Sequence, residues 1–502
     1  MLRSLLTKTA HRWINAAILT LLSSCLTSLT THATLPPDPP KGVSVLNSNG
    51  RALRTGILTN CNVDMISLVP DWNLVEPTEG IYDWTDYIDK DLNTIFTNGH
   101  GQAVLLRINT MGNSQNNGGK IPDWVYTAMG EDPTSLEADP GVTYSFFDGD
   151  VPHCIPVFWN PVYLAKKKAL IAMAGAHITA NPQFSSQVQV VAISYANAIT
   201  EDWNVPHDTD GSPSEVELWL NDPVTGNPPG AGYTTQKMID AAIHQADASF
   251  NDGSVTTGNT LNSPTATFTQ ADVGCIIVGR GYRRNTHIAS WISPTQVTLD
   301  RPLITGTGRR FTMKNRRDGL IDVAMAAFPN QYITTAVGGN GPDLDAATGD
   351  PDPGTYLART VDTMASTTYP TRYIVQRNNV TAIIPTKDVA TDAWVILADA
   401  ADAGMPTAGQ ALSNCYNDST YQMNGGNSNN CNHEDPNCAP WSPPCVDPCA
   451  ISYQQELDFS GDHIFTYNAS YYEVYYLDAG NLSLAHLHCV FNPDVNCGSC
   501  FP

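Results

Sequence analysis

The feature that most constrains the fold is a regular alternation of short apolar, β-branched runs with longer helical segments. Eight runs have the length and composition of buried strands: 41–46, 63–69, 102–108, 187–195, 331–337, 372–376, 405–410 and 471–477. Parallel strands need a crossover helix between them and are buried on both faces, so this alternation predicts a parallel sheet covered by helices. Eight strands favour a (β/α)8 barrel. A doubly wound sheet is the alternative, but no Gly-rich phosphate loop follows any strand.

One segment, 251–314, interrupts this rhythm. It is rich in Thr, Gly, Val and Ile and holds short strand candidates. Helical apolar spacing occurs on both sides of it, over 233–250 and 319–328, which predicts a small all-β module inserted into one helix. The predicted organisation is therefore a signal at 1–33, a barrel formed by 34–250 and 315–480, the module at 251–314, a Cys-rich loop at 411–460, and a tail at 481–502. Pro161–Ala180 is predicted as an amphipathic helix with Lys166, Lys167 and Lys168 on its solvent-exposed side.

The N-terminus predicts export. A basic start is followed by an apolar run over 13–22 and by small residues, with Thr31–Ala33 as a cleavage site. This is the pattern of a secretory signal and is too short for a membrane span. Leu22–Cys25 also resembles a bacterial lipobox, in which Cys25 carries lipid and tethers the protein to a membrane. Release and a lipid anchor remain the two alternatives. The predicted location is secreted or on the cell surface.

Charge and cysteines narrow the function further. The net charge of −23 argues against a nucleic-acid partner, because a phosphate backbone needs a basic face. Eight of the twelve cysteines lie between Cys415 and Cys500, which in an exported chain predicts disulfide stapling of a loop-rich region. Their spacings lack the paired C-x2-C knuckles of zinc sites, so we expect no metal and no cofactor. Cys275 is the candidate for an unpaired thiol.

A short aromatic motif suggests the class of ligand. The stretch Val69–Asp89 contains Trp72, Glu76, Gly80 and Trp84 just past a predicted strand. Aromatic faces pack on sugar rings and carboxylates accept from hydroxyls, although a Trp there can equally be a core residue. The pattern W-x3-E-P-x2-G-x-Y-x-W resembles the strand-2 region of clan-A glycoside hydrolases, in particular family 42-type β-galactosidases. The segment 251–314 is similar to β modules of phage tails and surface proteins, which points to attachment.

The working residues of a barrel enzyme lie at the C-terminal ends of its strands, and glycoside hydrolysis needs two carboxyls there. The resemblance implies a general acid/base after strand 4, which is Glu201, although the usual Asn-Glu pair is absent and Asn197 lies four residues upstream. It implies a Glu nucleophile at the end of strand 7, where this chain has Gln410. Glu473, in the eighth predicted strand, is the alternative nucleophile. A buried structural Glu473 paired with Arg107 or Arg372 is equally compatible with the sequence.

The sequence thus predicts a protein that hydrolyses O-glycosidic bonds of a poly- or oligosaccharide. The predicted catalytic residues are Glu201 and Glu473, and the predicted substrate-binding residues are Trp72, Glu76, Arg107, Asn109, Trp124, Asn197, Trp203, Gln376 and Gln410. The first alternative is an inactive barrel that binds polysaccharide, because a Gln amide cannot act as a nucleophile. The second is a surface adhesion protein in which the β module is the functional part. No G-x-S-x-G elbow or H-E-x-x-H helix supports another hydrolase class.

Overall fold

The computed structural model describes residues 38–47, 52–114, 119–148, 151–193, 203–204, 214–255, 258–283, 286–302, 305–335, 337–338, 342–344, 351–381, 384–390, 394–411 and 453–493. All of them except Asp38 belong to one compact unit, Pro39–Pro502. Several predictions lie outside these ranges, namely the signal at 1–33 with Cys25, and nearly all of the Cys-rich loop 411–460. Export, a lipid tether and stapling of that loop therefore stay predictions.

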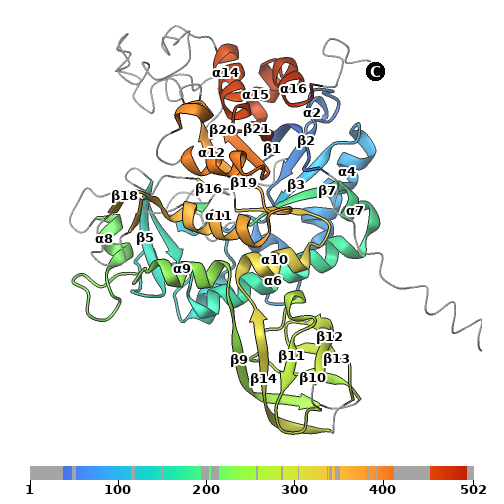
Figure 1. The fold of residues 1–502 in the computed structure, drawn as a ribbon, viewed down its shortest axis with the longest axis vertical. Helices are drawn as coiled ribbons and strands as arrows, with labels where there is room; N and C mark the ends of the chain where they lie inside the picture. Colours follow the sequence, from blue (N-terminus) through green and yellow to red (C-terminus); the bar gives the residue numbers. More distant parts are fainter. Residues whose placement is uncertain are drawn as a thin grey trace, which may run out of the picture. The chain divides into compact units, whose positions relative to one another are not determined.

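Eight parallel strands form a near-closed barrel (Figure 1). They are β1 (Gly42–Asn47), β2 (Met65–Leu68), β3 (Ala103–Arg107), β7 (Val188–Ala192), β15 (Tyr332–Thr334), β19 (Val375–Val380), β20 (Thr407–Ala411) and β21 (Ala469–Tyr475). Each pairs in parallel with its neighbour in this order, and β21 pairs with β1. Two backbone hydrogen bonds join β15 to β19. Ile333 N donates to Arg372 O at 3.0 Å, and Ile374 N donates to Ile333 O at 2.8 Å. The predicted eight-stranded parallel barrel is confirmed.

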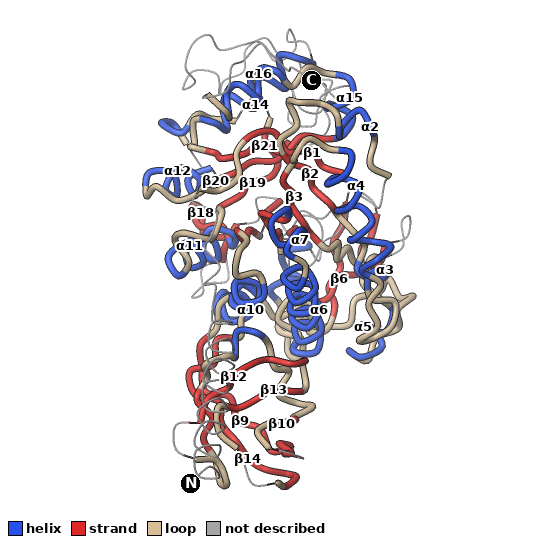
Figure 2. Tube along the Cα trace, turned by 90° about the vertical axis from the view of Figure 1, so that its right-hand side faces the viewer, coloured by secondary structure: helices blue, strands red, loops and turns tan. Residues whose placement is uncertain are grey.

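Helices surround the strands (Figure 2). The longer ones are α4 (Lys90–Asn98), α6 (Pro161–Ala180), α10 (Leu320–Ala327), α11 (Leu357–Thr368), α12 (Val395–Asp402) and α14 (Tyr453–Phe465). The shorter ones are α2 (Thr55–Leu58), α3 (Trp72–Val75), the π-helix η1 (Thr85–Asp89), α5 (Asp123–Met129), α7 (Pro182–Gln187), α8 (Glu215–Leu220), α9 (Thr235–Ala242), η2 (Gln270–Asp272), η3 (Lys387–Val389), α15 (Tyr476–Asn481) and α16 (Ala485–Phe491). None of the described helices is both long and apolar enough to cross a membrane.

Helix α6 starts at the predicted residue, but its three lysines do not all face solvent as predicted. Asn160 Oδ1 accepts from Val162 N at 3.0 Å, next to a proline in the first turn, a favourable N-terminal cap. Each helical residue turns about 100°, so three consecutive side chains cannot share one face. Lys167 is buried and donates to Thr110 Oγ1 at 3.0 Å. The prediction that all three lysines lie on the solvent-exposed side was therefore wrong for Lys167.

The inserted β module is a closed six-stranded antiparallel barrel with its own apolar core. Its strands are β9 (Gln245–Val255), β10 (Thr260–Asn262), β11 (Ile276–Val278), β12 (Thr286–Ser293), β13 (Gln296–Leu299) and β14 (Gly306–Arg317). The chain leaves α9 and returns to α10 at adjacent points, where Asp318 N donates to His244 O at 3.1 Å. The helix predicted over 233–250 was wrong beyond Ala242, because 245–255 pairs with β14 as a strand.

Charged side chains join the base of the module to the barrel. Arg316 Nε donates to Asp272 Oδ1 at 2.8 Å, and its Nη1 lies 3.5 Å from Asp318 Oδ2. His244 Nδ1 lies 2.6 Å from the other oxygen of Asp318, and Lys168 of α6 approaches that residue at 4.0 Å. Bidentate and shared ion pairs of this kind hold two elements in one geometry.

Smaller sheets lie beside the barrel. They are the three-stranded sheet of β4 (Asn113–Ser114), β6 (Val151–Pro156) and β5 (Thr143–Asp148), and the pair β17 (Pro342–Leu344) and β18 (Pro351–Tyr356). Strands β16 (Val337–Gly338) and β8 (Trp203–Asn204) extend the parallel sheet next to β19. None of the eight strands predicted from the sequence lies in the β5–β6 region, so this sheet was missed. Among the described cysteines, Cys154 and Cys275 are free thiols, whereas Cys61 and Cys489 are disulfide-bonded.

Asp362 makes the stability of the fold pH-dependent. It lies buried in α11, where its Oδ1 accepts from Tyr373 Oη at 2.5 Å, and burial raises its pKa from 3.8 to about 6. A raised carboxyl pKa means that the folded chain binds this proton more tightly than the unfolded chain, so its contribution is present below pH about 4 and is lost as pH rises through about 6. Asp362→Asn should remove this dependence. As the pH rises from 4 to 8, we expect the free energy of unfolding of the variant to increase by about 3 kcal/mol relative to that of the wild type. Urea unfolding of both proteins across that range measures it, and a difference that does not change with pH contradicts the assignment.

Candidate active site

The register of the strands identifies the side chains inside the barrel. Met65, Leu105, Ile374 and Tyr471 belong to a small buried cluster that is separate from the main core. Side chains alternate along a strand, so residues two positions further on point to the same interior, nearer the C-terminal end. Those residues are Ser67, Arg107, Gln376 and Glu473, and Gln410 joins them as the direct partner of Glu473. A polar layer therefore lies inside the barrel at the end where barrel enzymes place their active sites.

The centre of this layer is an ion pair across the barrel interior. Arg107 Nη2 on β3 donates to Glu473 Oε2 on β21 at 2.5 Å, and both side chains are almost completely buried. Arg107 Nη1 also donates to Gln410 Oε1 on β20 at 3.2 Å. We call Arg107, Gln410 and Glu473 the mouth cluster. Of the two partners predicted for Glu473, the structure selects Arg107; Arg372 instead donates to backbone carbonyls near the end of α10.

A second set of polar contacts lies beside the mouth cluster. Tyr471 Oη donates to Gln376 Oε1 at 2.6 Å, and Gln376 Nε2 donates to Asn378 Oδ1 at 3.1 Å. All three side chains are buried. Gln376 thus shares the interior layer with the mouth cluster, but both ends of its amide are occupied by the protein. Its contribution to a site is to orient Tyr471 and Asn378.

Several interior polar atoms have no hydrogen-bond partner among the described residues. They include Glu473 Oε1, Gln410 Nε2, Ser44 Oγ and Ser67 Oγ. Ser44 of β1 is the direct register partner of Glu473, so three of these atoms come from adjacent strands. Buried polar atoms require partners, and a group such as water or a ligand hydroxyl that enters the barrel can supply them. The interior therefore combines a fixed ion pair with donors and acceptors still to be satisfied.

The observed strand order shows on which barrel strands the predicted catalytic residues lie. Strand β20 is the seventh of the barrel and β21 the eighth, so Gln410 occupies the strand-7 position and Glu473 the strand-8 position. Strand β7 is the fourth, but Glu201 and Asn197, which follow it, lie outside the described residues, as does the side chain of Trp203.

The aromatic motif forms a different structure, a self-contained loop after β2. Trp72 is completely buried in α3, and its Nε1 donates to Glu76 Oε2 at 2.9 Å. The other oxygen of Glu76 accepts from Gly80 N at 2.8 Å, where the backbone adopts φ 75°. Trp124 Nε1 donates to the Glu76 carbonyl at 3.1 Å and packs edge-on against Trp72. Burial raises the pKa of Glu76 despite these donors.

This geometry predicts a packing role for Trp72. Trp72→Phe keeps most of the apolar volume but removes one hydrogen-bond donor from the buried Glu76 carboxylate, so we expect a loss of about 1–3 kcal/mol in the free energy of unfolding. Trp84→Phe is the matched control, because Trp84 is half-buried and stacks on Tyr82 and His177, a contact that Phe retains. Urea denaturation measures both variants. Equal losses in the two variants contradict a specific Trp72–Glu76 hydrogen bond.

Glu76 and Trp124 line a cavity of about 420 Å³ away from the barrel interior. Its other walls come from α6, including Lys166, and from the β module, including Thr295. Of the residues predicted to bind substrate, the structure thus brings Arg107, Gln376 and Gln410 together inside the barrel and places Trp72, Glu76 and Trp124 together beside α6. Asn109 belongs to neither group, since its Nδ2 donates to Asp71 Oδ1 at 3.0 Å and its Oδ1 accepts from Met111 N at 3.0 Å.

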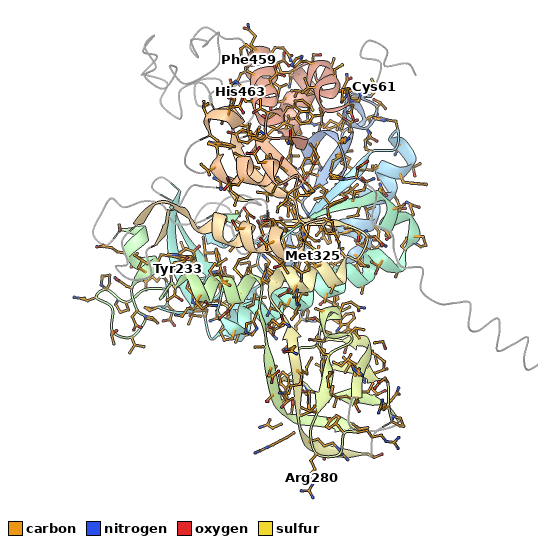
Figure 3. The ribbon with its side chains drawn as sticks, in the orientation of Figure 1. Cys61, Tyr233, Arg280, Met325, Phe459 and His463 are labelled. Carbon is orange, nitrogen blue, oxygen red and sulfur yellow. The ribbon has the colours of Figure 1, made fainter. Side chains whose placement is uncertain are left out.

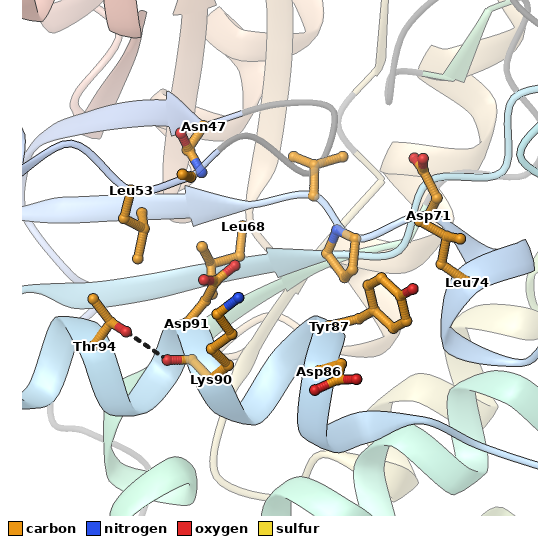
Figure 4. Close-up of a pocket in the computed structure, with 13 residues that line it drawn as sticks. Asn47, Leu53, Leu68, Asp71, Leu74, Asp86, Tyr87, Lys90, Asp91 and Thr94 are labelled. Carbon is orange, nitrogen blue, oxygen red and sulfur yellow. Dashed lines mark hydrogen bonds between the residues drawn. The ribbon is translucent and has the colours of Figure 1, made fainter.

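A further cavity, of about 440 Å³, lies at the C-terminal ends of β1 and β2 (Figure 4). Asp71, Tyr87, Lys90 and Asp91 are among its lining residues. Burial raises the pKa of Asp91, which lies half-buried on α4. The sequence analysis missed Tyr87, Lys90 and Asp91; the polar side of this helix, next to a strand end, is the signal that could have identified them.

Comparison with known proteins gives no family. No protein-family model matches the chain, and no curated protein sequence matches it. Within the described part of the chain, no group of three or more His, Cys, Asp or Glu side chains is arranged to hold a metal ion. The chain is thus an α/β protein consistent with a (β/α)8 barrel, with a polar cluster inside the barrel at the C-terminal ends of its strands.

Proposed function

We propose that the protein hydrolyses O-glycosidic bonds at the C-terminal end of the barrel, with Glu473 as nucleophile and Glu201 as general acid/base. One observation carries the proposal. The carboxylate of Glu473 has one oxygen held by Arg107, while its other oxygen has no partner among the described residues. A carboxylate nucleophile must be ionised and must present one oxygen to the anomeric carbon. Arg107 supplies the counter-charge that a buried carboxylate requires.

The proposed reaction follows the two-carboxylate scheme. Glu473 Oε1 attacks the anomeric carbon, while Glu201 protonates the leaving glycosidic oxygen and the glycosidic bond breaks. Glu201 then takes a proton from water, whose oxygen displaces Glu473 and releases the sugar. Gln410 Nε2, a buried donor of the mouth cluster that has no partner among the described residues, is suited to donate to a sugar hydroxyl next to the reacting carbon.

A second candidate function is binding of a saccharide without hydrolysis. It is favoured by Gln410, which occupies the seventh strand, where the resembling enzymes carry their nucleophile. The polar interior would then recognise a ligand while Glu473 serves only as the partner of Arg107. This alternative retains carbohydrate as the ligand and differs only in the absence of turnover.

One set of assays separates these functions. Wild type, Glu201→Gln and Glu473→Gln are tested on a panel of aryl glycosides and oligosaccharides, with binding measured by calorimetry. Hydrolysis by the wild type that is lost in both variants supports the enzyme. Saccharide binding without turnover supports the binding protein. Neither binding nor turnover rejects both.

A further inference from the structure

The β module carries a net positive charge, whereas the chain as a whole is strongly negative. Residues 245–317 contain nine of the 26 Lys and Arg residues but only four of the 49 Asp and Glu residues. The remainder of the chain is correspondingly more acidic than its net charge of −23 indicates. A basic island on an acidic protein creates a local field that attracts anions.

Two of the described basic residues, Arg280 and Arg310, line one groove on the module. Val278 of β11 pairs with Thr312 of β14, and Thr312 pairs with Ser249 of β9. These three side chains line the groove, which has a volume of about 530 Å³. Arg280 and Arg310 also line it. Figure 3 shows Arg280 at the end of the module farthest from Met325 of α10.

The two arginines line the same groove from different segments. Strand β11 ends at Val278, the register partner of Thr312, and Arg280 follows in the turn after it, while Arg310 lies on β14. Gly279 allows this approach, because a Cβ there would lie 2.5 Å from the Arg310 carbonyl oxygen. A third guanidinium, that of Arg309, lies against Gly281. Like charges close to one another repel, so this arrangement costs the fold stability.

No described carboxylate neutralises the pair. The four acidic residues of the module are all engaged elsewhere: Asp247 with Lys314, Asp252 with Ser263 and Thr265, Asp272 with Arg316, and Asp300 with His287. Neither Arg280 nor Arg310 forms an ion pair with any of them. The groove therefore presents two guanidinium groups, each able to bind an oxyanion through two parallel hydrogen bonds.

We propose that this groove binds an anionic polysaccharide through its carboxylate or sulfate groups, at a site independent of the barrel. The hydroxyls of Ser249 and Thr312 and the amide of Asn251 line the groove next to the arginines and match sugar hydroxyls. A single-stranded nucleic acid needs exposed aromatic rings on which bases stack, but Phe311 is buried and Phe250 is partly buried. The observations therefore favour a saccharide over a nucleic acid.

The test uses the full chain and four probes: polygalacturonate, dextran sulfate, uncharged dextran and single-stranded poly(dT). Arg280→Gln/Arg310→Gln removes the groove charges. Arg301→Gln/Arg317→Gln is the matched control, because it removes two exposed arginines of the same module that do not line the groove. We expect the wild type to bind a polyanion at low salt but not dextran, and the groove variant to bind roughly tenfold more weakly. The control variant should stay within about threefold of the wild type.

Three outcomes overturn the proposal: no binding of either acidic polysaccharide by the wild type, equal losses in the two double variants, or tighter binding of poly(dT) than of the polysaccharides. The thermal midpoint of the groove variant should not fall, because it removes a repulsion. Glu473→Gln, measured in parallel, should bind the polyanions as the wild type does. Failure at the groove is thus distinguishable from failure of the proposed hydrolysis.

Discussion

Arg107→Met is expected to lower the free energy of unfolding by about 3–5 kcal/mol, the largest effect of any single substitution considered for this protein. Arg107 is almost completely buried and donates to both Glu473 and Gln410. Methionine fills much of the volume but leaves the Glu473 carboxylate buried without its counter-charge. The midpoint of urea unfolding at unchanged slope measures the loss.

A double variant shows whether the ion pair causes this effect. Arg107→Met/Glu473→Leu removes both charges, so most of the loss should be recovered, because an apolar pair often replaces a buried ion pair at little cost. Arg283→Met, at an exposed arginine of the β module, is the control and should change stability by no more than about 0.5 kcal/mol. A double variant as unstable as the sum of its single variants contradicts the interaction.

Glu473→Gln is expected to abolish hydrolysis, with a fall in kcat on the order of 10⁴-fold, the scale of losing a nucleophile. The amide cannot form the glycosyl intermediate, although it still occupies the space beside Gln410 and Ser44. The substitution also weakens the contact with Arg107, so activity has to be expressed per folded molecule, with the folded fraction taken from the unfolding curve.

Two further variants are needed to interpret the kcat of Glu473→Gln. Glu79→Gln changes an exposed carboxylate that pairs with Lys166 beside α6, so it should leave kcat within about twofold. Arg107→Met, assayed below its unfolding transition, should lose turnover together with Glu473→Gln if the ion pair holds the nucleophile. A folded Glu473→Gln protein that retains wild-type turnover removes Glu473 from the mechanism.

The barrel could be predicted from the sequence because its signal is local. Buried parallel strands such as β3 and β7 are continuous apolar runs, and each is recognisable within its own few residues. Prediction failed where a pairing distant in sequence decided the structure. Residues 245–255 carry a pattern compatible with a helix, and only their pairing with β14 makes them a strand. The β5–β6 hairpin was missed for another reason: its pairing is local, but Pro152 and Pro156 interrupt the strand pattern of its second half.

The candidate site was predictable only in part. Strand alternation suffices to place Arg107 and Glu473 inside the barrel, but they are 366 residues apart, and sequence alone could not choose between Arg107 and Arg372 as the partner. The aromatic motif shows a different limit. Its spacing suits a sugar site, and in the structure Trp72 and Gly80 both donate to Glu76 and thereby fix the loop. The sequence pattern alone does not separate these two roles, and sugar binding by the motif stays a prediction.

The most direct test of the proposed mechanism is to trap the intermediate. The full-length protein is incubated with activated 2-deoxy-2-fluoro glycosides of several sugars, digested, and analysed by peptide mass spectrometry. The mechanism predicts one glycosyl adduct on the peptide that contains Glu473, and its absence in Glu473→Gln. An adduct on another carboxylate, or wild-type turnover of natural glycosides with no adduct on Glu473, contradicts the mechanism.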